Sequence, residues 1–136
     1  MYKFEKLEVW QLALEYIDQI YDLAESLPRS EDFNLRSQIT RAATSVALNI
    51  AEGSTGQSDA EQARFWGLAI RSLIETVACL RIIERRGLGA DLKKLEQADA
   101  HSRIVVAKLH AFRKSLTVGK NKISEPQSNY FVDLEM

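Results

Sequence analysis

Apolar side chains recur in this chain at alternating steps of three and four residues, and they do so in four long segments. Such a step, about 3.5 residues on average, places the apolar side chains on one face of a helix. In residues 6–26 the apolar stripe consists of Leu7, Trp10, Leu14, Ile17, Tyr21 and Ala24. In residues 31–52 the stripe consists of Leu35, Ile39, Ala42, Val46 and Ile50. In residues 58–86 it consists of Trp66, Ile70, Leu73, Val77 and Leu80. In residues 90–116 it consists of Leu92, Leu95, Val106, Leu109, Phe112 and Leu116. The pattern predicts four amphipathic helices.

Glycine and capping residues set the expected ends of these helices. Gly53 and Gly87 stand where the second and third helices should end, since glycine is the preferred residue after a helix C-terminus. Ser30 is suited to the N-cap of the second helix. Ser58 is suited to the N-cap of the third, because Glu61 follows it by three residues and completes a capping box.

Short connections between long helices favour an all-α fold, namely an antiparallel up-down-up-down four-helix bundle over residues 1–116. Residues 117–136 are mostly polar and form a separate C-terminal tail. The end of this tail contains an apolar patch made of Tyr130, Phe131, Val132 and Leu134. The patch either docks on a neighbouring surface or belongs to a frayed terminus.

The second helix contains an uncharged stretch, since residues 42–51 are AATSVALNIA. A helix on the outside of a monomeric bundle normally exposes charged side chains to solvent. Helical spacing also places small side chains in a second stripe, made of Thr40, Thr44, Ala47 and Ala51, which would allow another helix to approach closely. We infer that this helix is covered on two sides, by its own bundle and by another subunit. The alternative is that the small stripe simply faces solvent.

A third stripe of the same helix is polar and consists of Gln38, Arg41, Ser45, Asn49 and Glu52. One interpretation is a structural network in which Arg41 and Glu52 pair with Arg71 and Glu75 of the third helix. The other is a ligand site, because an arginine and an asparagine that project together can hold a phosphate or a peptide backbone.

Composition excludes several classes of protein. The chain has 136 residues with 18 basic and 19 acidic side chains, so its net charge is −1, which excludes a strongly basic, histone-like nucleic-acid binder. The single cysteine excludes an intramolecular disulfide and a multi-cysteine metal site. No apolar run approaches the roughly 20 residues of a membrane helix, and the N-terminus lacks the apolar core of a signal peptide. We therefore expect a cytoplasmic protein without a membrane partner.

Catalytic and metal-binding patterns are missing from the sequence. Ala98 and Ala107 stand three residues before His101 and His110, where a di-metal bundle would carry glutamate. Cys79 lies among apolar residues, which is typical of a small core residue rather than a nucleophile. We therefore expect neither enzymatic activity nor a cofactor nor a metal ion.

Charge is distributed unevenly along the chain. Residues 1–28 contain 2 basic and 6 acidic side chains, whereas residues 88–116 contain 6 basic and 3 acidic ones. In a ring of subunits the acidic and basic sides of the bundle would meet. The basic side also supplies candidate contacts to RNA or DNA phosphates: Arg85, Arg86, Lys93, Lys94, Arg103, Lys108, Arg113 and Lys114. These residues do not fall on one helical stripe, so solvated surface charge is the alternative interpretation.

Three sequence motifs carry a family resemblance. The first is F-x-x-L-x-V-W-Q from Phe4 to Gln11, the second is R-A-A-x-S-V-x-x-N-I-A-E-G from Arg41 to Gly53, and the third is E-x-x-R-F-W-x-L-A-x-x-S-L-x-E from Glu61 to Glu75. Together they resemble the four-helix-bundle proteins encoded in intervening sequences of bacterial large-subunit rRNA genes. The resemblance covers residues 3–116.

This resemblance implies a left-handed four-helix bundle that assembles as a ring-like homopentamer and whose biochemical role is largely unassigned. A related branch, the accessory variability determinant of diversity-generating retroelements, binds a reverse transcriptase and nucleic acid. Two functions follow as hypotheses: a non-enzymatic oligomeric scaffold or interaction module, and a nucleic-acid-binding accessory that acts with rRNA or a reverse transcriptase. The residues expected in an interface or a structural network are Arg41, Ala43, Thr44, Ser45, Ala47, Asn49, Glu52, Gly53, Arg71 and Glu75.

Overall fold

The computed structural model describes residues 1–55 and 58–117, which form four long helices and two short 3-10 turns. In chain order the elements are η1 (Lys3–Lys6), α1 (Glu8–Glu25), η2 (Arg29–Glu31), α2 (Leu35–Ser54), α3 (Asp59–Arg86) and α4 (Leu92–Thr117). Within these described ranges there is no β-strand. The prediction of an all-α four-helix fold is therefore confirmed.

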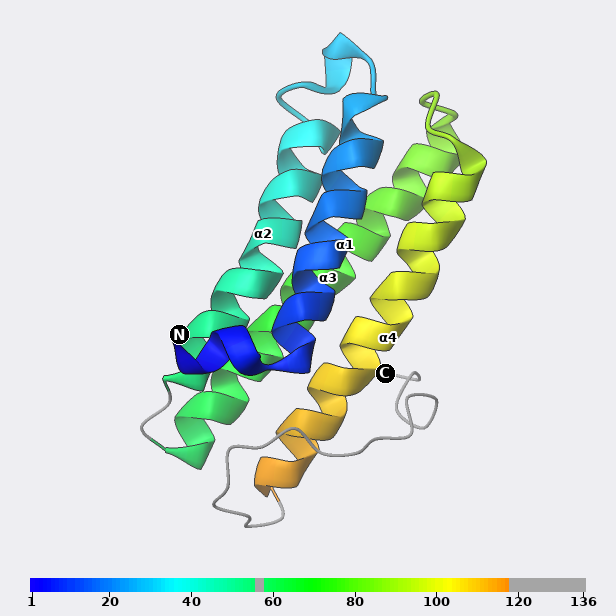
Figure 1. Ribbon diagram of the computed structural model, residues 1–136. Coiled ribbons are helices and arrows are strands. Elements are labelled where there is room, and N and C mark those ends of the chain that lie inside the picture. Colours follow the sequence, from blue (N-terminus) through cyan, green and yellow to red (C-terminus); the bar gives the residue numbers. More distant parts are fainter. Residues whose placement is uncertain (56–57, 118–136) are drawn as a thin grey trace.

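The helices lie side by side, and successive helices are connected at alternate ends of the bundle (Figure 1). Helix α1 packs on α2 and α4, and α3 packs on the same two helices from the other side. The predicted tail, residues 117–136, falls outside the described residues except for Thr117, the last residue of α4. Across the part of the chain that the structure describes, no helix has an apolar stretch long enough to cross a membrane.

Both ends of α3 agree with the capping signals in the sequence. Ser58 caps α3 as predicted, because its hydroxyl oxygen accepts a hydrogen bond from the backbone N–H of Glu61 at 3.1 Å. The same helix ends at Arg86, and Gly87 follows it in the left-handed conformation with φ of 58°. This is a conformation that glycine adopts without the steric cost of a Cβ.

The predicted start of the second helix at residue 31, capped by Ser30, is wrong. Residues Arg29–Glu31 form the 3-10 turn η2, and α2 begins four residues later, at Leu35. The Glu31 carboxylate accepts hydrogen bonds from the Asn34 side-chain amide at 2.9 Å and from the Leu35 backbone N–H at 3.4 Å. Glu31, which was expected to lie in the first turn of the second helix, therefore caps α2 from outside the helix.

The predicted core stripe of the first helix is confirmed at Leu7 and Ala24, which are buried, and is wrong at Leu14 and Tyr21. The fully buried residues of α1 are Val9, Ala13, Tyr16, Ile20 and Leu23. By contrast, Leu14 is 36% exposed and Tyr21 is 47% exposed. Apolar residues occupy two adjoining faces of this helix, and both fit steps of three and four residues, so spacing alone did not show which face is buried. The face that was predicted to be core lies at the edge of the core, where Trp10 and Ile17 are only partly buried.

The other three stripes agree with the prediction at most positions. All five residues predicted for α2 are buried, and in α3 only Val77 of the predicted stripe is less than fully buried. In α4 the stripe is buried from Leu95 onward, whereas Leu92 at the start of the helix is exposed. The core therefore runs along the whole length of α2, α3 and α4.

Gly53 was expected to end the second helix, but α2 continues to Ser54, and the glycine instead lies at a close contact with α3. A Cβ atom at this position would lie 2.9 Å from both the Phe65 Cβ and the Trp66 Cζ3. The Gly53 carbonyl also accepts a hydrogen bond from the buried side-chain amide of Gln62 at 3.0 Å. The indole ring of Trp66 in turn packs on Phe112 of α4, with the ring centres 4.9 Å apart. Gly53 thus belongs to the packing that joins α2, α3 and α4.

Candidate functional site

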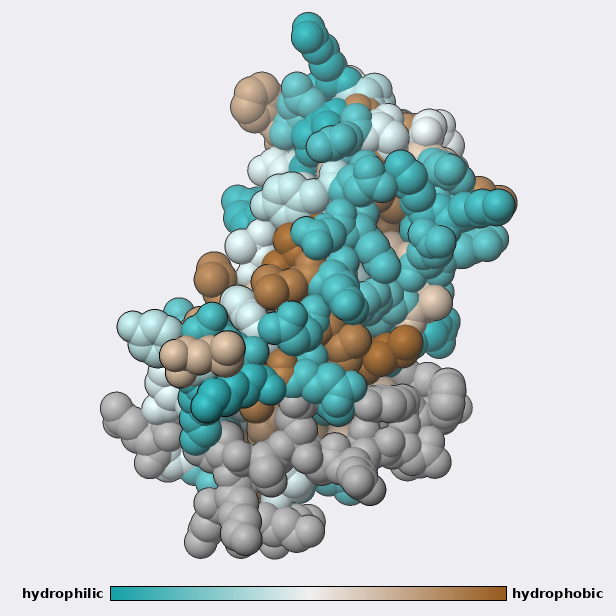
Figure 2. Space-filling model, viewed as in Figure 1, coloured by the Kyte–Doolittle hydropathy of each residue, from teal (hydrophilic) through white to brown (hydrophobic). Residues whose placement is uncertain are grey.

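An apolar strip follows the outer side of α1 and α2, and we call it the α1–α2 face. Its members are Trp10, Leu14, Ile17 and Tyr21 of α1 and Thr44 and Leu48 of α2. Leu48 is 56% exposed, more than any other apolar residue of α1 or α2. Figure 2 shows apolar side chains that interrupt the hydrophilic surface over these two helices. Exposed apolar patches of this kind mark interaction surfaces more often than isolated exposed leucines do.

The two helices are fixed to each other along this face. The Thr44 hydroxyl donates to the Thr40 carbonyl at 2.9 Å, so it accepts the hydrogen bond that the Tyr21 hydroxyl donates at 3.1 Å. The phenol ring of Tyr21 is therefore held over α2 although almost half of it is exposed. This hydrogen bond links α1 to α2 within the α1–α2 face.

The uncharged stretch 42–51 is explained in part by packing within a single chain. Ala43 and Ala47 are buried in the chain's own core, and Ala47 is only 3% exposed. The other members of the stripe of small residues, Thr40, Thr44 and Ala51, are partly buried, and Thr44 is hydrogen-bonded to Tyr21 of α1. What stays uncovered in the stretch is mainly Leu48.

The polar stripe of α2 forms a small hydrogen-bond network with α3. The Ser72 hydroxyl donates to the Ser45 hydroxyl at 2.9 Å. The Asn49 side-chain amide donates to the carbonyl and the hydroxyl of Ser45, at 2.9 Å and 3.1 Å. Ser45 and Asn49 are therefore structural residues at the α2–α3 contact.

The charged part of the expected network is not brought together. Arg41, Glu52, Arg71 and Glu75 are all exposed. Among residues 1–55 and 58–117, neither Arg41 nor Glu52 forms an ion pair with Arg71 or Glu75. These four side chains are available at the surface, two on α2 and two on α3.

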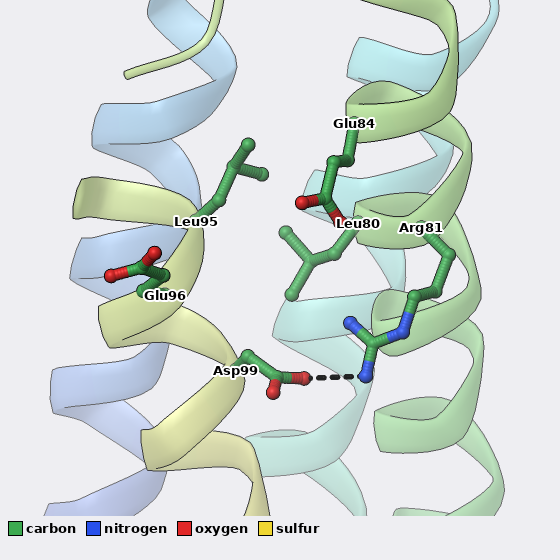
Figure 3. A pocket seen from close by; sticks show the side chains of 6 residues that line it. All are labelled: Leu80, Arg81, Glu84, Leu95, Glu96 and Asp99. Carbon is green, nitrogen blue, oxygen red and sulfur yellow. Dashed lines mark hydrogen bonds and ion pairs between the residues drawn. The ribbon is translucent and has the colours of Figure 1, made fainter. Parts of the chain in front are cut away.

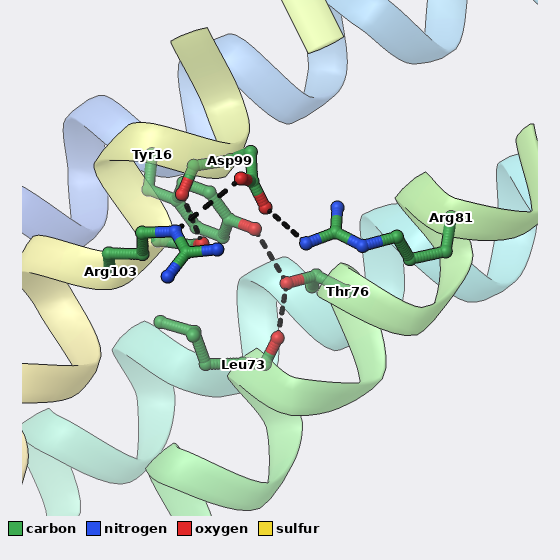
Figure 4. Close-up of polar contacts among 7 residues, drawn as sticks. Tyr16, Leu73, Thr76, Arg81, Asp99 and Arg103 are labelled. Atoms are coloured by element: carbon green, nitrogen blue, oxygen red, sulfur yellow. Dashed lines mark hydrogen bonds and ion pairs between the residues drawn. The ribbon is translucent and has the colours of Figure 1, made fainter. Parts of the chain in front are cut away.

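A buried polar cluster connects α1, α3 and α4 (Figure 4). The Thr76 hydroxyl donates to the Leu73 carbonyl at 2.5 Å, so it accepts from the Tyr16 hydroxyl at 2.7 Å. Burial raises the pKa of Tyr16 to about 12. Asp99 of α4 lies at the edge of this cluster and pairs with Arg81 at 2.8 Å and with Arg103 at 3.5 Å. The Tyr16 phenol stays protonated and the Asp99 carboxylate is paired with arginines. We therefore interpret this cluster as structural.

A shallow cleft of about 210 Å³ opens between α3 and α4 beside this cluster (Figure 3). Its lining consists of Leu80, Arg81, Glu84, Leu95, Glu96 and Asp99. Sequence reasoning missed the cleft, although one signal pointed to it: Asp99 interrupts the apolar stripe of the fourth segment. The nearby Cys79 offers no ready nucleophile, since burial raises the pKa of its thiol. Within the described ranges, no three His, Cys, Asp or Glu side chains are placed to hold a metal ion.

The eight basic residues proposed to contact nucleic acid do not share one surface. Lys108 has a side chain that is only 5% exposed, and its ammonium lies 2.8 Å from Glu8 of α1. Lys94 pairs with Asp22 at 3.0 Å, and Arg103 pairs with Asp99. Arg113 packs its guanidinium against Gly67, while Lys114 is exposed near the end of α4. Of the eight basic residues, Arg85, Arg86 and Lys93 are exposed at the α3–α4 connection, where Glu84 and Asp91 are exposed as well.

These features define a class of protein: a four-helix bundle with an exposed apolar face on its first two helices and a buried polar cluster inside. The chain belongs to the family of 23S rRNA-intervening sequence proteins, whose pattern matches residues 5–111. It is similar to a solved structure from Bacteroides thetaiotaomicron, described as a protein with unknown function from the S23 ribosomal protein family. The two chains are 25% identical with a TM-score of 0.71, and the match covers 78% of this chain and 95% of the other. A search of curated proteins finds no match.

Proposed function

We propose that this protein is a non-enzymatic homo-oligomeric scaffold, assembled as a ring-like homopentamer, in which the α1–α2 face is covered by another subunit. The observation that carries the proposal is the exposure of three large apolar side chains, Leu14, Tyr21 and Leu48, on two neighbouring helices. Full burial of an exposed leucine or aromatic side chain contributes about 1.5–3 kcal/mol, and these three side chains are 36–56% exposed, so a contact that covers them recovers roughly half of that value for each. The rest of the contact area must offset the cost of association. The resemblance of the Arg41–Gly53 motif to ring-forming bundles supports the same conclusion.

The non-enzymatic part of the proposal is supported by the ionisation of the buried groups. Burial raises the pKa of both Tyr16 and Cys79, so both side chains stay protonated near neutral pH. A general base or a thiolate nucleophile requires the opposite shift or a neighbouring base.

The substitution Leu48→Glu tests the role of the α1–α2 face. A buried, unpaired carboxylate in a subunit contact is costly, so we expect the variant to have a lower solution mass than the wild type by light scattering. The matched control is Gln38→Glu, which adds the same charge at an exposed position of the same helix. Both variants should keep the helical circular dichroism of the wild type. A Leu48→Glu variant with the wild-type mass would show that this face is not an interface.

A second candidate function is a nucleic-acid-binding accessory protein that acts with rRNA or a reverse transcriptase. It is supported by Arg85, Arg86 and Lys93, which are exposed at one end of the bundle. Among the described residues these three side chains form no ion pair. Phosphate contacts of this kind make affinity fall with salt concentration.

Binding of a structured rRNA fragment at two salt concentrations separates the two functions. The accessory function predicts binding that weakens with salt and a smaller salt dependence in the double variant Arg85→Gln, Arg86→Gln. Arg64→Gln is a matched control, because Arg64 is an exposed arginine at the other end of the same helix and pairs only weakly with Glu61 at 3.5 Å. If no binding is detected at low salt, the accessory function is wrong.

A further inference from the structure

The cleft between α3 and α4 combines an apolar floor with charged walls. Leu80 of α3 and Leu95 of α4 form the floor, and both are buried. Glu84 extends from α3 into the gap, and Glu96 stands at the rim on α4 (Figure 3). The volume of about 210 Å³ lies below the roughly 300–1,000 Å³ of sites for drug-sized ligands. The cleft therefore suits a small ligand.

Ion pairs close one end of this cleft. The Arg81 guanidinium lies 2.8 Å from one oxygen of the Asp99 carboxylate, and the Arg103 guanidinium lies 3.5 Å from the other oxygen. Each oxygen of Asp99 thus has a basic partner within the chain. Asp99 therefore contributes little free negative charge to the cleft.

The two glutamates of the cleft have no such partner. Within residues 1–55 and 58–117, neither the Glu84 nor the Glu96 carboxylate forms an ion pair or a side-chain hydrogen bond. Two exposed basic residues stand close by in sequence, since Arg85 follows Glu84 and Lys93 precedes Glu96 by three residues. Neither of them lines the cleft. The charge that a ligand meets in the cleft, beyond the closed end, is therefore negative.

This combination selects an aliphatic cation. An ammonium group is a compact positive charge with three hydrogen-bond donors, which suits a carboxylate. A short chain of methylene groups favours an apolar floor over water. An anion would be repelled by Glu84 and Glu96, and a neutral ligand would partly desolvate both carboxylates without pairing them. Among the described residues no three His, Cys, Asp or Glu side chains are grouped to hold a metal ion, which leaves an organic cation.

We propose that the cleft between α3 and α4 binds a short aliphatic diamine, with one ammonium group at Glu84, the other at Glu96 and the methylene chain over Leu80 and Leu95. The inference goes beyond the proposed function and does not depend on it, because the α1–α2 face belongs to the other two helices. Exposed ion pairs are individually weak, so the dissociation constant should lie at about 1–10 mM.

A titration of the full chain with 1,5-diaminopentane, followed by NMR of labelled leucine methyl groups, tests the proposal. The methyl signals of Leu80 and Leu95 should shift and reach saturation. Pentylamine, which has one ammonium group, should bind more weakly, and 1,5-pentanediol, which has none, should not bind. The methyl signal of Leu14 is the internal reference, because helix α1 contains five acidic residues and no basic one. A diamine that only gathers near negative charge would shift that signal too.

Three variants separate the cleft from general charge effects. Glu84→Gln and Glu96→Gln should each weaken diamine binding about two- to fivefold, which is the value of one exposed ion pair. Glu75→Gln is the matched control, because Glu75 is exposed on α3 about two and a half turns before Glu84, and so on the opposite side of the helix. This control should bind the diamine as the wild type does.

Arg81→Gln should have the opposite effect. The substitution removes a positive charge from the cleft and leaves Asp99 with Arg103 alone, so the diamine should bind about two- to fivefold more tightly. Unchanged methyl signals outside the cleft would confirm that each variant is folded. Shifts of Leu80 and Leu95 that never saturate, or an equal effect of Glu75→Gln and Glu84→Gln, would overturn the proposal. Equal shifts of Leu14 at the same diamine concentrations would also overturn it.

Discussion

The same substitution, glycine to alanine, should have opposite effects at the two helical glycines of this bundle. At Gly53 in α2, the new methyl group would lie 2.9 Å from the Phe65 Cβ, which is fixed to the α3 backbone, and 2.9 Å from the ring of the fully buried Trp66. At Gly67 in α3, the nearest atom is the Arg113 guanidinium carbon at 3.3 Å, the far end of a flexible side chain on an exposed residue. The first neighbour cannot move without shifting a helix, and the second can.

The magnitudes follow from two opposing effects. Alanine is favoured over glycine inside a helix by up to about 1 kcal/mol, although less near a helix end such as Gly53. Forcing an extra methyl group into a closely packed contact costs about 1–3 kcal/mol. Gly53→Ala should therefore lower the free energy of unfolding by about 1–2 kcal/mol, whereas Gly67→Ala should raise it by about 0.5–1 kcal/mol.

Chemical unfolding followed by circular dichroism measures both values. The two variants and the wild type must be compared at one protein concentration, because assembly makes apparent stability depend on concentration. If the denaturation midpoint of Gly53→Ala equals or exceeds that of the wild type, the close α2–α3 contact at this glycine is not as described. A strongly destabilised Gly67→Ala would show that Arg113 is held more rigidly than its exposure indicates.

Two further predictions concern the buried cluster and the α3 cap. Because burial raises the pKa of Tyr16 from 10.0 to about 12, the folded state holds this proton more tightly than the unfolded state, so stability should be lost as the pH rises from 10 toward 12. In Tyr16→Phe this alkaline loss of stability, measured by urea titration, should be smaller. At neutral pH the variant should be less stable than the wild type by about 0.5–1.5 kcal/mol, because the hydrogen bond to Thr76 is lost. An unchanged dependence of stability on alkaline pH would contradict the raised pKa of Tyr16. Ser58→Ala removes the acceptor for the Glu61 backbone N–H and should cost about 1 kcal/mol, measured as a lower thermal midpoint, while Ser58→Asp should restore most of it.

Local signals predicted the helices of this protein well. The four helices, the Ser58 cap and the Gly87 stop each depend on residues within a few positions of one another. The start of α2 was missed by four residues because Glu31 accepts hydrogen bonds from Asn34 and Leu35 instead of lying within the helix. Capping by a preceding glutamate requires the same residue types at the same spacing as an ordinary first helical turn, so the sequence alone does not distinguish the two.

The candidate site could be predicted only in part, because its residues depend on contacts distant in sequence. The exposed apolar residues of α1, such as Leu14, were recognised but assigned to the core. Which face of α1 is buried depends on its contacts with the other helices, and those contacts bury Tyr16 and leave Leu14 at the surface. The buried Tyr16 hydroxyl has a hydrogen-bond acceptor only in Thr76, sixty residues later. Lys108 was counted as a surface cation, yet it pairs with Glu8, one hundred residues earlier. No pattern within one helix contains either partner.

The solution mass of the wild-type protein, measured by light scattering over a wide range of protein concentration, tests the proposed assembly most directly. We expect a single species close to five times 15.4 kDa, the mass of one chain, whose mass does not fall on dilution until the contact dissociates. A mass of 15.4 kDa at every concentration would mean that Leu14, Tyr21 and Leu48 stay exposed to water, and the proposed assembly would be wrong.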